Sequence, residues 1–258
     1  MAELNFPTQL HKEAIEIVRD FFVKEKDIDT ILLTNSCARG KAIAGSDIDF
    51  AILAKKIIQP GEIKILENKW RNFLHAEPTL LKYKSSHRFA QIHLDIIDGI
   101  YTPSVWDDGG GPDFFEVEIG NHLVYSAPLA GKGEYFTELQ EKWLPYYNTV
   151  MQSARLKMVK EACLDDLDHI AFLVKRGLHF HAFDKLYKAF HEFLQALFIR
   201  HETYPIAYNK WVKEQVYEIL HLPELYKKFP QVISVNNIES DELSLKGKIL
   251  QKLLEEYC

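Results

Sequence analysis

The chain has 258 residues, 47% of them apolar, and carries a formal net charge of -6 at pH 7. This length suits one large domain or two small ones and is enough to bury a substantial core. The acidic balance argues against extended nucleic acid as a partner, because binding many phosphates requires a concentrated basic surface. No apolar run approaches the roughly 20 residues that span a bilayer, and the N-terminus lacks a secretory signal pattern. We therefore expect a cytoplasmic protein with no membrane partner.

The first expected element is a helix over residues 8–26. Thr8 follows Pro7 and can cap this helix, and an apolar stripe along it is expected to cover one face of a sheet. A strand, a turn and a second strand follow between Ile31 and Leu53. Small polar residues form the corner between the two strands, where the chain is expected to turn tightly.

Asp47 and Asp49 lie two residues apart on the second strand. Because side chains alternate between the faces of a strand, these carboxylates point together, away from the face that carries the apolar residues Ile48, Phe50 and Ile52. Two carboxylates on one face repel each other and are costly to bury unless a cation lies between them. Magnesium with a phosphate substrate is the ordinary solution, so this pair is the candidate metal site.

Three further elements are expected before residue 100. They are a helix over residues 60–75 and strands over residues 78–83 and 90–98. On the last strand, alternation leaves His93, Asp95 and Ile97 on the face opposite the apolar one. Asp95 is therefore the candidate third carboxylate.

The spacing of these residues resembles a known signature. Ser36, followed by ten residues and then Asp47-Ile48-Asp49, with Asp95 on a later strand, is similar to the pattern of the DNA polymerase beta-type nucleotidyltransferase superfamily. A finer similarity, to the minimal and the antibiotic nucleotidyltransferases within it, covers residues 36–40 and 45–49.

This resemblance implies a magnesium-dependent enzyme. It would move a nucleoside monophosphate, expected to be AMP, from an NTP to a hydroxyl of a small-molecule acceptor and release pyrophosphate. Asp47 and Asp49 would hold two magnesium ions that bind the triphosphate, and Asp95 would complete the second site and help to activate the acceptor. The turn would present backbone N–H groups, a hydroxyl and a guanidinium to the phosphates. The expected nucleotide-binding residues are Ser36, Arg39 and Ser46.

Asn35 occupies the position before Ser36 where such proteins usually have glycine. Glycine adopts positive φ at no steric cost, and asparagine is the other residue that adopts it most readily, so we expect the corner to be kept. This departure leaves open a catalytically weakened binding or antitoxin-like module of the same fold. An enzyme that nucleotidylates a protein is a third alternative.

The cysteines are expected to be free thiols. Cys37, Cys163 and Cys258 are widely spaced and form neither a disulfide framework nor a metal-binding pair. Cys37 lies beside the expected phosphate loop, but metal-assisted phosphoryl transfer needs no thiol nucleophile. We interpret it as a small filler residue.

The second half of the chain has helical periodicity. A glycine-rich connector over residues 106–112 and a short strand over residues 123–125 precede an expected boundary in residues 128–133. We expect a nucleotidyltransferase domain over residues 1–130 and a helical acceptor-side domain over residues 134–258. Helices are expected over residues 150–176, 183–201 and 210–220. The predicted fold class is α+β: a nucleotidyltransferase fold with a mixed sheet and flanking helices, followed by an all-α bundle.

This order of domains resembles the kanamycin- and streptomycin-type antibiotic nucleotidyltransferases, in which helices wall the acceptor side of the cleft. Asp165 and His169 are four residues apart, opposite the apolar face of their helix, so they project together. We expect Asp165 to bind or deprotonate the acceptor, with Lys210 as a second candidate contact; a solvated surface is the alternative. Arg176 and His181 have the spacing of HEPN ribonucleases, which leaves ribonuclease activity as another alternative.

Overall fold

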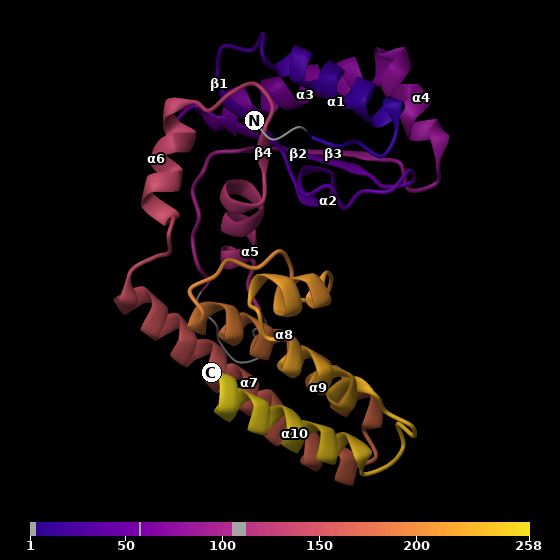
Figure 1. Cartoon of the computed structure of the whole chain (residues 1–258), viewed down its shortest axis with the longest axis vertical. Helices are drawn as coiled ribbons and strands as arrows, with labels where there is room; N and C mark the ends of the chain where they lie inside the picture. Colours follow the sequence, from indigo (N-terminus) through magenta and orange to yellow (C-terminus); the bar gives the residue numbers. More distant parts are fainter. Residues whose placement is uncertain (1–3, 57, 105–111) are drawn as a thin grey trace. The chain divides into compact units, whose positions relative to one another are not determined.

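The structure is a computed structural model that describes residues 4–56, 58–104 and 112–258. The chain forms two compact units (Figure 1). The first comprises Met1–Tyr101 and Glu118–Leu144, and the second comprises Thr102–Val117 and Pro145–Cys258. The chain therefore passes from one unit to the other after Tyr101, after Val117 and after Leu144. The expected division into domains at residues 130–134 stays a prediction.

The first unit is built on a mixed sheet whose described strands lie in the order β3-β2-β1-β4. The strands are β1 (Ile28–Leu33), β2 (Ile48–Ala54), β3 (Ile92–Ile97) and β4 (Ala127–Pro128). β1 runs antiparallel to β2 and to β4, whereas β2 and β3 are parallel. A parallel pair requires a long crossover connection, and the helices between β2 and β3 supply it.

Three helices cover one face of this sheet (Figure 1). They are α1 (Gln9–Phe22), α3 (Pro60–Ala76) and α4 (Pro78–Ser86). Thr8 caps α1 as predicted, since its Oγ1 accepts a hydrogen bond from the N–H of His11 (3.2 Å). Buried side chains of the three helices, such as Val18, Trp70 and Leu80, pack with alternate residues of β1 and β2. The opposite face of β2 is thereby left for Asp49.

Shorter elements complete the first unit. They are α2 (Asn35–Ala38), the π-helical turn η1 (Gly120–Val124), α6 (Glu134–Trp143) and the end of α5 (Phe115–Ile119), which the second unit shares.

Two predicted strands are wrong, because both segments are helical. Residues 78–83 belong to α4, since Pro78 lies in its first turn and the Glu77 carboxylate accepts a hydrogen bond from the N–H of Thr79 (3.2 Å). Residues 123–125 lie at the end of η1. Apart from Pro112, the predicted connector over residues 106–112 lies outside the described residues.

Helix α6 begins against β1 through one carboxylate. Asp29 accepts hydrogen bonds from the N–H groups of Tyr135 (3.1 Å) and Phe136 (3.0 Å), and N–H groups in a first helical turn have no acceptor within their own helix. The negative charge also interacts favourably with the helix N-terminus. A Cβ at Gly133 would lie 2.2 Å from Asp29 Oδ2. Only glycine fits there without displacing Asp29.

We expect the Asp29→Ala variant to lose about 1 to 2 kcal/mol of unfolding free energy, because the start of α6 loses its acceptor. Urea denaturation followed by circular dichroism measures this change. Asp20→Ala is the matched control, since Asp20 pairs with Arg19 on the surface (2.8 Å) and exposed pairs contribute little. Equal unfolding midpoints for Asp29→Ala and the wild type would contradict the assignment.

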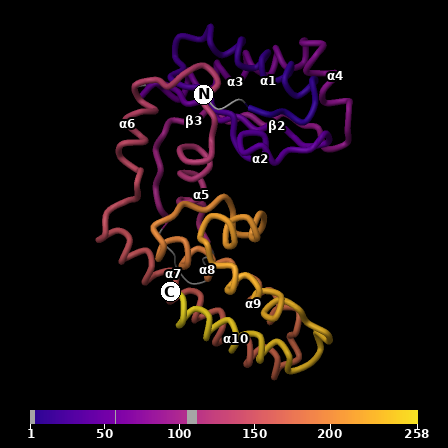
Figure 2. Tube along the Cα trace, in the orientation of Figure 1, coloured from indigo at the N-terminus to yellow at the C-terminus, as the bar shows by residue number. Residues whose placement is uncertain are grey.

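The second unit is helical and, together with the mixed sheet of the first, confirms the predicted fold class. Its described helices are α7 (Thr149–Lys175), α8 (His179–Arg200), the π-helical η2 (Glu214–Ile219), α9 (Pro223–Ile233) and α10 (Glu242–Tyr257). α7 and α8 form a hairpin whose turn contains Gly177 at a φ of 71°. α10 packs along both (Figure 2). None of the described helices combines enough length with enough apolar character to cross a bilayer.

Candidate functional site

Asp47 and Asp49 occupy the start of β2. Ile48, Phe50 and Ile52 on this strand are almost fully buried against the helices, so strand alternation places Asp49 on the opposite face, where it is half-buried. Asp47 immediately precedes the strand and is also half-buried. The predicted pair therefore lies on an accessible side of the sheet.

Strand β3 contributes a histidine to this pair. In the parallel register of β2 and β3, Asp49 lies opposite His93 and Ala51 lies opposite Asp95. Ligand atoms of Asp47, Asp49 and His93 lie within 4.8 Å of one another, and among the described residues these three form the one group of this kind. Asp95 is exposed one register pair further along the same face. Its part in a metal site stays a prediction.

The turn between β1 and β2 is fastened to the backbone beside the two carboxylates. The N–H of Thr34 donates to the carbonyl oxygen of Asp49 (2.9 Å), and Cys37 Sγ donates to the carbonyl oxygen of Asp47 (3.5 Å). Asn35 adopts a φ of 53°, which is the left-handed geometry expected of the residue that replaces glycine here. The short helix α2, which contains Ser36, is thus held next to the start of β2.

Cys37 is a buried thiol in this turn. Burial, together with the nearby charges of Asp49 and Asp47, raises its pKa to about 12. The thiol is therefore protonated at neutral pH and is a poor nucleophile. This supports its interpretation as a filler residue.

The predicted nucleotide-binding residues flank this turn. Ser36 and Arg39 are half-buried at α2, and the carbonyl oxygen of Ser36 accepts a hydrogen bond from the N–H of Lys41 (2.9 Å). Ser46 precedes the two carboxylates, and its Oγ accepts a hydrogen bond from the N–H of Ile43 (2.9 Å). The Ser46 hydroxyl thus takes part in the turn. Its contact with nucleotide stays a prediction.

His11 and Tyr83 hold the backbone of Ser46 in place through its carbonyl oxygen. The sequence analysis did not identify this role. The Tyr83 hydroxyl donates to the carbonyl oxygen of Ser46 (2.6 Å), and His11 Nε2 lies 3.3 Å from the same oxygen. Burial lowers the pKa of His11, although the carbonyl of Ser46 opposes this shift. These residues come from α1 and α4, so only the tertiary fold brings them to the loop.

The predicted acceptor residues belong to the second unit and are exposed there. The side chain of Asp165 is 67% exposed, and its Oδ2 lies 3.6 Å from Nδ1 of His169. The two residues project together, as predicted. Lys210 is exposed as well, and its carbonyl oxygen accepts a hydrogen bond from Gln215 Nε2 (2.9 Å).

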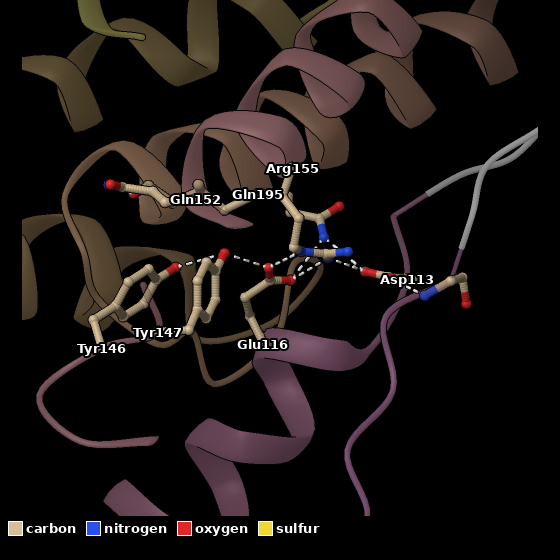
Figure 3. Close-up of polar contacts among 9 residues, drawn as sticks. Asp113, Glu116, Tyr146, Tyr147, Gln152, Arg155 and Gln195 are labelled. Atoms are coloured by element: carbon tan, nitrogen blue, oxygen red, sulfur yellow. Dashed lines mark hydrogen bonds and ion pairs between the residues drawn. The ribbon is translucent and has the colours of Figure 1, made fainter. Parts of the chain in front are cut away.

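The second unit also contains a buried charge cluster, defined as Asp113, Glu116, Tyr147, Arg155 and Gln195 (Figure 3). Arg155 donates through Nε to Glu116 Oε1 (2.5 Å) and through Nη2 to Asp113 Oδ1 (2.7 Å). Gln195 Nε2 donates to both carboxylates, at 2.8 Å each. The Tyr147 hydroxyl donates to Glu116 Oε1 (2.8 Å). The guanidinium therefore neutralises one of two buried carboxylates and hydrogen-bonds both.

This cluster fastens a short segment to the helices. Asp113 and Glu116 belong to Thr102–Val117, the part of the second unit that precedes α6 in sequence. Arg155 and Gln195 lie on α7 and α8. Burial, followed by the charge of Glu116, raises the pKa of the Tyr147 hydroxyl, so it remains a donor. A structural role explains these contacts fully.

Comparison with known proteins gives little similarity. No protein-family model matches the chain, and no curated protein matches it at a significant level. Among solved structures, it is similar to one from Exiguobacterium sibiricum 255-15 that is described as a nucleotidyltransferase-like protein. The two are 11% identical, the similarity covers 95% of this chain and 75% of that chain, and the TM-score is 0.47. We therefore infer the function from the side chains of the site.

Proposed function

We propose that this protein is a metal-dependent nucleotidyltransferase that moves AMP from ATP to a hydroxyl of a small-molecule acceptor and releases pyrophosphate. The observation that carries the proposal is the convergence of Asp47, Asp49 and His93 within 4.8 Å, directly beside the turn that contains Ser36. A carboxylate pair next to a left-handed turn and a short helix is suited to a cation and a triphosphate together.

The donor set fits a divalent cation. Asp47 and Asp49 supply two carboxylates at the start of β2, and they repel each other unless a positive charge lies between them. A bound cation would neutralise the triphosphate and stabilise the entering and leaving oxygens. Asp47 and Asp49 would hold this cation, and Asp95 would help to complete a second site.

The remaining residues of the loop would bind the nucleotide. Ser36 would offer its hydroxyl and backbone N–H to the β and γ phosphates, and the guanidinium of Arg39 would pair with them. Ser46, held by His11 and Tyr83, would fix the chain leading into Asp47. Most of the catalysis would then come from positioning and charge neutralisation.

The proposal also names the residues that would bind the acceptor. A cytoplasmic antibiotic-type enzyme would use Asp165, with Lys210 as a second contact, to bind the acceptor hydroxyl. Neither residue is required for binding the nucleotide, so substitutions there would affect acceptor turnover alone.

We expect label transfer and pyrophosphate release when the protein is incubated with a divalent cation, an α-labelled NTP and a panel of aminoglycoside-like polyols. Labelled ATP should react more than the other three NTPs. Label recovered on the protein itself would indicate a protein-nucleotidylating enzyme. Saturable ATP binding without transfer to any acceptor, or hydrolysis of RNA in its place, would contradict the proposal.

A further inference from the structure

His93 is placed to act as a ligand at the proposed metal site. Its Nε2 lies 3.6 Å from Asp47 Oδ2, and the register of β2 and β3 places it directly opposite Asp49. The imidazole is 58% exposed and the Asp47 side chain 44% exposed. Both side chains are therefore free to rotate without disturbing the core.

The distances agree with a shared ion. Ligand bonds to small divalent cations are about 2.0 to 2.2 Å long, so two ligand atoms on one ion lie about 3 Å apart when adjacent and about 4 Å apart when opposite. The 3.6 Å between His93 and Asp47 falls in this range. The ligand atoms of Asp47, Asp49 and His93 lie within 4.8 Å of one another. A side-chain movement of about 1 Å or less would therefore bring them to the separations expected around one ion.

A mixed set of two carboxylates and one imidazole has a different metal preference from a set of carboxylates alone. Magnesium is a hard ion that binds oxygen and releases water reluctantly. Imidazole nitrogen suits first-row transition metals, whose affinity for nitrogen and oxygen sites rises from Mn²⁺ onward. An imidazole opposite Asp49 would therefore favour a transition-metal ion over magnesium.

We propose that His93 is a direct metal ligand through Nε2 and that it makes this site bind Mn²⁺ more tightly than Mg²⁺. The inference rests on the proposed metal site and names its third ligand. The alternative is that His93 forms only an exposed ion pair with Asp47, and such pairs contribute little to stability. The two alternatives differ in the ligands of the metal: direct ligation by His93 adds a nitrogen ligand, whereas an ion pair leaves the metal with oxygen ligands alone.

The test uses metal alone, with no nucleotide and no acceptor. Mn²⁺ is titrated into the full chain and free Mn²⁺ is followed by electron paramagnetic resonance. We expect the His93→Gln variant to bind Mn²⁺ at least about tenfold more weakly than the wild type. The matched control is His75→Gln, at an exposed histidine on α3, which should bind as the wild type does. Circular dichroism checks that each variant is folded.

A spectroscopic signature separates ligation from ion pairing. Electron spin-echo modulation of bound Mn²⁺ should show a directly coordinated ¹⁴N in the wild type and in His75→Gln, but not in His93→Gln. The His93→Asp variant, with three carboxylates, should bind Mg²⁺ more tightly than the wild type and lose the nitrogen signal.

Two results would overturn the inference: no nitrogen coupling in the wild type, or equal Mn²⁺ affinity in the wild type and His93→Gln. If bound Mn²⁺ shows nitrogen coupling but the protein transfers no label, His93 is a ligand and the proposed reaction is wrong. If the protein transfers label but the bound ion has oxygen ligands alone, the proposed reaction stands and the role of His93 as a ligand is wrong.

Discussion

The Asp49→Asn variant is expected to lose nucleotidyl transfer by a factor of about 10³. Asp49 is the member of the carboxylate pair that lies within β2 and opposite His93. Losing a charged ligand removes several kcal/mol of transition-state charge stabilisation, and each ~1.4 kcal/mol is a factor of about ten in rate. Because the variant relieves repulsion between two carboxylates, its unfolding midpoint without metal should equal or slightly exceed that of the wild type.

Thermal melting with and without metal and ATP tests this assignment independently of turnover. The complex should raise the melting temperature of the wild type and leave that of Asp49→Asn nearly unchanged, since a ligand stabilises only a protein that binds it. Asp20→Asn, on the exposed end of α1, is the matched control and should behave as the wild type. Equal stabilisation of the wild type and Asp49→Asn would remove Asp49 from the site.

The Arg155→Met variant is expected to lose about 3 to 5 kcal/mol of unfolding free energy. Arg155 is 4% exposed, and it is the cation between the buried carboxylates of Asp113 and Glu116. Methionine retains most of the volume but leaves both carboxylates without a counter-charge, and burying an unpaired charge is strongly unfavourable. Urea denaturation followed by tryptophan fluorescence and circular dichroism gives the free energy.

The control for this substitution is Arg200→Met, at an exposed position at the end of α8. Surface substitutions of this kind change stability by about 0.5 kcal/mol or less. A loss for Arg155→Met no larger than that of the control would mean that the carboxylates find other partners or take up protons. Adding Glu116→Gln to Arg155→Met should recover part of the loss, because only one unpaired carboxylate then remains.

Local periodicity is enough to predict the elements that carry the carboxylate pair. Alternation along β2 separates Asp49 from its apolar neighbours, and the Thr8 cap and the long apolar stripes identify α1, α7 and α8. The same reasoning fails at residues 78–83, where a short apolar run fits a strand and a helix equally well. There the cap from Glu77 and the position of Pro78 favour the helix.

Register is the information that local patterns lack. Shifting β3 by two residues would place Asp95 opposite Asp49 and keep every side chain on the same face. The sequence therefore predicts the face on which a third ligand would lie but not which residue lies opposite Asp49, and in the structure that residue is His93. The contacts of Ser46 with His11 and Tyr83, and of Arg155 with Glu116, join residues far apart in the chain. Each depends on packing that no short pattern encodes.

The chain passes between its two units three times, and this order affects folding during synthesis on the ribosome. The segment Thr102–Val117 emerges before β4 and α6, which complete the first unit, and before α7 and α8, to which it is fastened. Between Val117 and Gln195 a ribosome adds 78 residues (195 minus 117), which takes roughly 4 to 16 s at typical elongation rates. Until Arg155 and Gln195 have been synthesised, Asp113 and Glu116 lack the partners that they have in the folded protein. Because β4 and α6 precede α7 and α8 in the chain, the first unit is expected to be able to fold before the second unit.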